Sequence, residues 1–164
     1  MMRILGIDPG RQITGYGCVD LPDHAHEPAL VEAGVLRFNA KLPMVKRLAA
    51  LHDDLTRLIE ELRPQRVAVE KLYAHYKHPR TAILMGHARG VILLAAEQAD
   101  LPVCDLPSTE VKKSITGNGH ATKQQMQLAV QAQCGLDEPP SPPDVADAIA
   151  IALCHARRIA TERM

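Results

Sequence analysis

Long hydrophobic runs are absent from this sequence. No stretch of about 18 apolar residues without a charge occurs, so we expect no transmembrane helix. The N-terminus leads directly into a predicted strand, and we expect no signal peptide. The four cysteines are far apart and form no CxxC pair, which favours buried free thiols in a reducing cytoplasm. The length of 164 residues predicts one domain over residues 1–164 in the cytoplasm.

The chain also lacks a net charge, because 19 basic residues balance 19 acidic residues. A net charge of zero, taken by itself, argues against nucleic-acid binding. The distribution argues otherwise, because no acid occurs between Glu70 and Glu97 or between Glu110 and Asp137, and both windows contain several basic residues. Segregated charge of this kind can present one basic face to phosphates. The alternative is that both windows are ordinary solvated stretches.

Aromatic residues are scarce, with three tyrosines, one phenylalanine and no tryptophan. Two of these four rings, Tyr73 and Tyr76, follow Glu70 closely and lie between Lys71 and Lys77. Aromatic rings among cations are suited to stacking on an unpaired base and to contact with its phosphates. The alternative is that Tyr73 packs into the core beneath a loop.

Two carboxylates stand at the ends of predicted strands. The apolar run at residues 4–7 ends in Asp8 and a Pro-Gly turn, and a second strand at 15–19 completes a β-hairpin. The apolar strand at residues 66–69 ends in Glu70. A carboxylate fixed near the centre of a sheet is unfavourable unless a cation neutralises it.

Two more carboxylates, Asp144 and Asp147, lie three residues apart at the start of the last predicted helix, so they share one helical face. Together with Asp8 and Glu70 they would form an oxygen-rich pocket that suits hard divalent cations such as Mg²⁺. The alternative assigns each acid a local role. Asp8 would cap a turn, Glu70 would pair with a lysine, and the helical pair would favour a helix N-terminus.

The remaining pattern predicts an α/β fold. Strands are expected at 29–38 and 101–106, and helices at 43–62, 79–99, 107–115, 123–134 and from 143 to about 161. We expect Ser108, Thr122 and Ser141 to cap the last three of these helices. The element order predicts a mixed five-stranded sheet with helices on both faces. Gly86 and Gly90 within a helix indicate close approach of another backbone, from this chain or from a second one.

Five motifs occur in a fixed order along residues 3–156. They are GIDPG-RQI-TGYG, VEKLY, LMGHARGV, VKKSITGNGHATKQQMQ and PPDVADAIAIALCHA. Together they resemble the RuvC-type Holliday-junction resolvases, which are metal-dependent DNA endonucleases of the ribonuclease-H-like fold. The resemblance implies four catalytic carboxylates, namely Asp8, Glu70, Asp144 and Asp147. It implies that they hold two Mg²⁺ ions, which Mn²⁺ can replace.

The resemblance also assigns DNA contacts. It places an exposed aromatic residue at Tyr73 and basic residues that face the scissile phosphate at Lys112 and Lys123. The basic windows add two candidates, Lys77 and Arg80.

The chain departs from the family at three positions. Tyr73 stands where the family often has Phe, and Lys71 stands where Gln is frequent. Arg11 stands where the family often has a small hydroxyl residue, and it either contacts DNA or restricts the site.

The implied partners are four-way junction DNA, a second copy of the chain bound through the helix at 79–99, and the RuvA–RuvB branch-migration motor. The implied reaction is a pair of symmetric nicks that leave a 5′ phosphate and a 3′ hydroxyl. Three alternatives remain open. They are another ribonuclease-H-like nuclease acting on RNA or a branched nucleic acid, a phosphotransfer domain related to sugar kinases or actin, and a junction-binding dimer without catalysis.

Overall fold

The hairpin predicted at the start of the chain is confirmed. In the computed structural model, which describes residues 1–72 and 78–164, β1 (Met2–Pro9) pairs antiparallel with β2 (Ile13–Leu21). β3 (Ala29–Arg37) pairs antiparallel with β2 on one side. β4 (Arg66–Glu70) pairs parallel with β1, and β5 (Val103–Leu106) pairs parallel with β4. The result is the expected mixed sheet, in the order β3-β2-β1-β4-β5.

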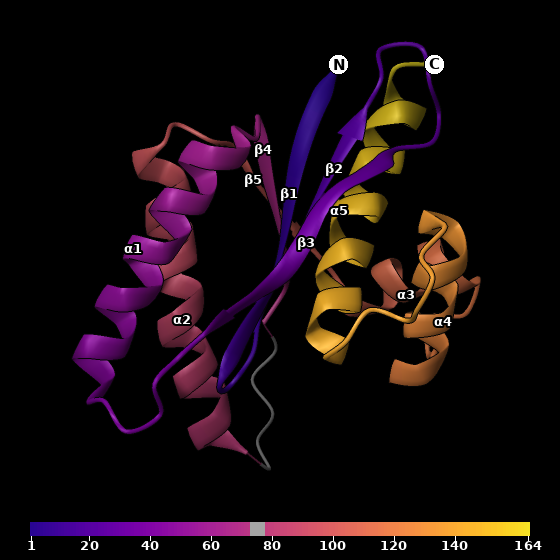
Figure 1. Ribbon diagram of the computed structural model, residues 1–164. Helices are drawn as coiled ribbons and strands as arrows, with labels where there is room; N and C mark the ends of the chain where they lie inside the picture. The colour runs from indigo at the N-terminus through magenta and orange to yellow at the C-terminus, as the bar shows by residue number, and fades with distance from the viewer. Residues whose placement is uncertain (73–77) are drawn as a thin grey trace.

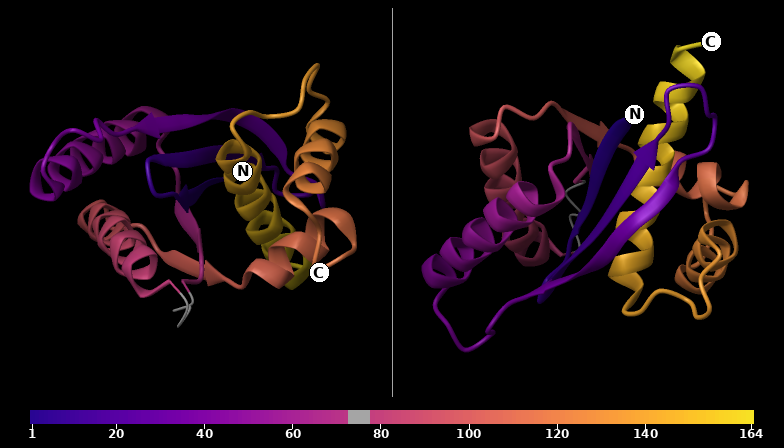
Figure 2. Two further views of the ribbon diagram at one scale, coloured as in Figure 1. Left: turned by 90° about the horizontal axis from the view of Figure 1, so that it is seen from below. Right: turned by 45° about the horizontal axis from the view of Figure 1, so that its top comes forward.

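Helices cover both faces of this sheet, as predicted (Figures 1 and 2). One face carries α1 (Met44–Leu62) and α2 (Pro79–Gln98). The other carries α5 (Pro143–Glu162), with α3 (Ser108–Thr116) and α4 (Lys123–Cys134) packed against it. Alternating side chains of β1 and β4 divide between two cores, so that Leu5 and Val67 face α1 and α2 while Ile4 and Ala68 face α5. In the part of the chain that the structure describes, no helix has the length and apolar character needed to cross a membrane.

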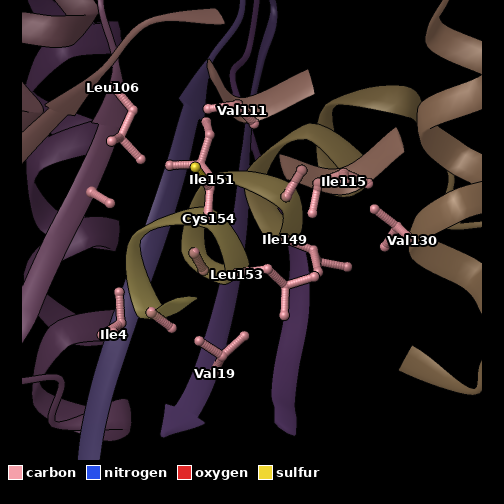
Figure 3. Close-up of a cluster of buried hydrophobic side chains, with 14 of the residues drawn as sticks. Ile4, Val19, Leu106, Val111, Ile115, Val130, Ile149, Ile151, Leu153 and Cys154 are labelled. Atoms are coloured by element: carbon pink, nitrogen blue, oxygen red, sulfur yellow. The ribbon is translucent and has the colours of Figure 1, made fainter. Parts of the chain in front are cut away.

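The α5 helix forms the centre of the larger core (Figure 3). Thirteen of its 20 residues are buried, and many of these are alanine, so its backbone can lie close to the sheet. Glycines on the strands allow the closest contacts. A Cβ atom at Gly6 would lie 2.3 Å from the backbone oxygen of Ala148, and one at Gly15 would lie 2.2 Å from that of Asp144. The strands therefore fix the position of the first turns of α5.

The helix caps were predicted only in part. Thr122 caps α4 as expected, since its hydroxyl accepts a hydrogen bond from the Gln125 backbone N–H at 3.1 Å, and the Gln125 side-chain oxygen accepts one from the Thr122 backbone N–H at 2.9 Å. The prediction for Ser108 is wrong, because Pro107 occupies the cap position and Ser108 is the first helical residue. The prediction for Ser141 is also wrong, because Pro142 holds the cap position of α5.

Candidate active site

The four predicted carboxylates line one cleft of about 970 Å³. β1 and β4 run parallel with Ile7 opposite Val69, so the next residues, Asp8 and Glu70, lie side by side at the same end of the sheet. This end is the lower edge in Figure 1, where α5 also begins. The close approach of α5 to β1 and β2 brings Asp144 and Asp147 to the two strand ends.

The cleft is unfavourable for negative charge. Burial raises the pKa of Asp8 well above its usual range, and the charges of Asp147, Glu70 and Asp144 raise it further. Burial is likewise the main reason why the pKa of Asp147 rises to about 6, with the Glu70 charge as the next cause. Raised carboxyl pKa values mean that the site favours neutralisation of its acids by protons or by cations.

Glu70 has a more favourable environment than Asp8. Burial raises the pKa of Glu70, but a hydrogen bond from the Ser108 hydroxyl and the positive charge of Lys112 act in the opposite direction. Ser108 can make this contact because it lies two residues beyond Leu106, which pairs with Glu70 across β4 and β5. The residue expected to cap α3 therefore supports a site carboxylate.

The donor set fits divalent metal ions. All four acidic side chains offer carboxylate oxygen, which is the ligand that Mg²⁺ and Mn²⁺ prefer. The hairpin turn is shaped around one of them, since a Cβ at Gly10 would lie 2.7 Å from the Asp144 Oδ2 atom. Within residues 1–72 and 78–164, no three His, Cys, Asp or Glu side chains surround a single point closely enough to hold one ion. The four carboxylates therefore line the cleft without three of them converging on one point.

The predicted DNA contacts fall into three groups. Lys112, Lys123 and Arg11 line the cleft together with the acids. Arg80 is exposed at the start of α2 and is not among the cleft-lining residues. Tyr73 and Lys77 lie outside the described residues.

The sequence analysis missed part of the cleft wall. Gln12 and Arg37 line it from the hairpin turn and the end of β3, and Thr81 and Met85 line it from α2. One sequence signal could have indicated Arg37, because it lies in a third acid-free window, residues 33–52, that contains four basic residues. The contribution of α2 depends on tertiary packing and has no comparable local signal.

Comparison with known proteins identifies the family. The family model described as "Crossover junction endodeoxyribonuclease RuvC" matches residues 4–155. The chain belongs to this family. The RuvC of Pelotomaculum thermopropionicum is 44% identical over 162 residues, which cover 99% of this chain and 97% of that protein. The RuvC of Rhodopirellula baltica is 48% identical over 151 residues, which cover 92% of this chain and 84% of that protein.

Solved structures agree with this assignment. The RuvC of Thermus thermophilus in complex with a Holliday junction substrate superposes with a TM-score of 0.89 at 34% identity, covering 99% of this chain and 97% of that one. The ribonuclease-H-like fold is thereby confirmed. As a RuvC family member, the chain is a crossover junction endodeoxyribonuclease, a metal-dependent hydrolase of DNA that acts in recombination and repair.

Proposed function

We propose that this protein resolves four-way DNA junctions in the cytoplasm by paired symmetric nicks, using a single nuclease domain over residues 1–164. The observation that supports the proposal best is the convergence of four carboxylates and two lysines in one cleft at the end of the sheet. The proposed catalytic residues are Asp8, Glu70, Asp144 and Asp147. The RuvC of T. thermophilus that matches over 99% of this chain is described in complex with a Holliday junction.

Each side chain has a role that follows from its position. Asp8 and Glu70 stand on adjacent parallel strands, and the two acids of α5 stand on a helix packed against them, so the backbone that carries all four acids is fixed before metal binds. The four acids would hold two Mg²⁺ ions, or Mn²⁺ in their place, and metal bound there would supply activation of a water and neutralisation of the charge on the leaving 3′ oxygen. Lys112 and Lys123 hold the phosphates of the cut strand against the acids.

The segment that follows Glu70 in the sequence supplies a further proposed contact. Tyr73 follows Glu70 by three residues, and we propose that its ring stacks on a base unpaired at the crossover. Arg11 at the cleft wall, with Lys77 and Arg80, contacts phosphates nearby.

The proposed enzyme is a homodimer that uses the outer face of α2. Ile83 is 61% exposed and Leu94 is 51% exposed on this helix, and a Cβ at Gly90 would meet no atom within 4 Å. Contacts among the described residues of this chain therefore do not explain the glycine, whereas a second backbone would. Two matched cuts need two sites related by symmetry. The RuvA–RuvB motor is proposed to deliver the junction to this dimer.

The function can be tested with a synthetic four-way junction and a linear duplex of the same sequence. With Mg²⁺ or Mn²⁺ we expect paired nicks in opposed strands that ligase can seal, and with a chelator we expect binding without cleavage. Equal cleavage of the linear duplex would refute junction resolution. Preferential cleavage of an RNA–DNA hybrid would favour the alternative ribonuclease-H-like function.

The dimer can be tested with a matched pair of leucines. Leu94 on α2 and Leu128 on α4 are 51% and 50% exposed, so the same polar substitution removes a similar apolar surface from each. We expect Leu94→Glu to weaken dimerisation at least about tenfold and Leu128→Glu to leave it unchanged. Light scattering measures the dimer, and junction assays should show single nicks where paired cuts are lost. Equal dimerisation of both variants would exclude the α2 face.

A further inference from the structure

A second group of cations extends from the cleft wall toward the start of α1. Residues 33–52 contain four basic residues and no acid. Arg37, Lys41 and Lys46 in this window are exposed, and Arg11 on the neighbouring hairpin turn is exposed as well. Within residues 1–72 and 78–164, none of these four side chains forms an ion pair. Their positive charge is therefore available to an external partner.

Contacts between the two segments hold these cations as one surface. The Phe38 backbone N–H donates to the Gln12 carbonyl at 3.3 Å, which joins the end of β3 to the hairpin turn. The Arg47 guanidinium lies over the Phe38 ring, 5.8 Å from its centroid, and donates to the Arg11 carbonyl at 3.4 Å. Because Arg11 and Arg37 also line the cleft, the surface continues from the cleft to the start of α1.

Helix stability does not explain the order of the charged residues along α1. Its first turn carries Lys46 and Arg47 and no acid, whereas its acids lie further along and its last turn carries no base. The helix dipole favours the opposite order, with acids near the N-terminus and bases near the C-terminus. The cations are concentrated at the end of α1 that adjoins the cleft, in spite of this unfavourable interaction.

We propose that Arg11, Arg37, Lys41 and Lys46 form an arm surface, which extends from the cleft wall to the start of α1 and binds the phosphates of a duplex arm of the substrate. This inference rests on the proposed function, because it assumes that junction DNA occupies the cleft. Cations spread over an exposed surface suit the repeated phosphates of a duplex rather than one small anion. The contacts are sequence-independent, and they set the orientation of the arm relative to the carboxylates.

The test compares two double variants that remove the same charge. Lys41→Gln/Lys46→Gln removes two cations from the arm surface, and Arg57→Gln/Arg163→Gln removes two exposed cations from other parts of α1 and the C-terminus. Affinity for four-way junctions is measured without metal at several salt concentrations. We expect the first variant to bind roughly tenfold more weakly and to lower the salt-dependence slope by roughly 1 to 2, with the control unchanged.

Junctions with arms of different length distinguish DNA binding by the arm surface from DNA binding by the cleft. The loss in Lys41→Gln/Lys46→Gln should disappear as the junction arms are shortened, because short arms do not reach the start of α1. Lys41→Arg/Lys46→Arg should retain the wild-type slope, since it keeps both charges.

Three outcomes would overturn the inference. The first is an equal salt-dependence slope in the two Gln variants, and the second is a loss of junction affinity that persists with the shortest arms. The third is unchanged junction affinity together with weaker binding of an acidic protein. Failure of the proposed function would look different, because the wild-type protein would then bind linear duplex and junction equally.

Discussion

Asp8→Asn is expected to lower the rate of junction cleavage by at least about a thousandfold while junction binding persists. The carboxylates are proposed to hold the metal, whereas the lysines hold phosphates, so the change removes one function and leaves the other. Glu70→Gln, Asp144→Asn and Asp147→Asn should behave in the same way. Single-turnover cleavage with Mg²⁺ and junction affinity without metal measure the two functions separately.

The same variants provide a readout that does not depend on activity. Because burial and repulsion raise the pKa of Asp8, its charged form opposes folding at neutral pH, and Asn should raise the unfolding temperature of the metal-free protein. Mg²⁺ should then stabilise the wild type more than the variant. Asp53→Asn, at an exposed position of α1, serves as the control and should change neither quantity. Loss of metal-free junction binding in all four site variants would indicate a structural role for these acids.

Gly15→Ala is expected to damage both stability and cleavage. The added Cβ would lie 2.2 Å from the backbone oxygen of Asp144, so the start of α5 must move away from β2. Overpacking of this kind costs about 1–3 kcal/mol of unfolding free energy. Because Asp144 moves with the backbone, we also expect cleavage per folded molecule to fall by about a hundredfold.

Enlargement of an exposed residue is the control for Gly15→Ala. Ala29 is exposed at the start of β3, away from the cleft and from α2, so Ala29→Val should change neither the unfolding free energy by more than about 0.5 kcal/mol nor the cleavage rate. Thermal unfolding and cleavage normalised to folded protein measure both variants. A Gly15→Ala protein with wild-type stability and rate would show that α5 does not depend on a glycine at this position.

Local sequence was sufficient where the deciding interactions are local. An apolar run that stops at a carboxylate predicted that β1 ends close to Asp8 and β4 at Glu70, and Thr122 as a cap residue predicted where α4 begins. The prediction from local sequence failed at Ser108. Pro107, whose backbone is extended, takes the cap position, and the Ser108 hydroxyl is left to reach Glu70. That contact depends on the pairing of β4 with β5, which propensity does not encode.

The remaining parts of the cleft depend on interactions between distant segments. Arg37 reaches the site only because β3 ends beside the hairpin turn, and Met85 reaches it because α2 packs near the strand ends. The roles of Tyr73 and Lys77 stay predictions from the motif and from charge, since both residues lie outside the described part of the chain.

The position of α5 has a consequence for local opening of the native state. Amide groups in a buried central helix exchange with solvent only through openings that approach global unfolding, whereas loops and exposed helix ends open at much lower free energy. Asp147 lies between the buried residues Ala146 and Ala148 and belongs to the first kind of segment, whereas Lys41 belongs to the second. Asp144 lies in the first turn of α5, where its backbone packs against β2 at Gly15. Asp147 therefore stays ordered as long as the domain is folded, while the loop cation can rearrange around a substrate at little energetic cost.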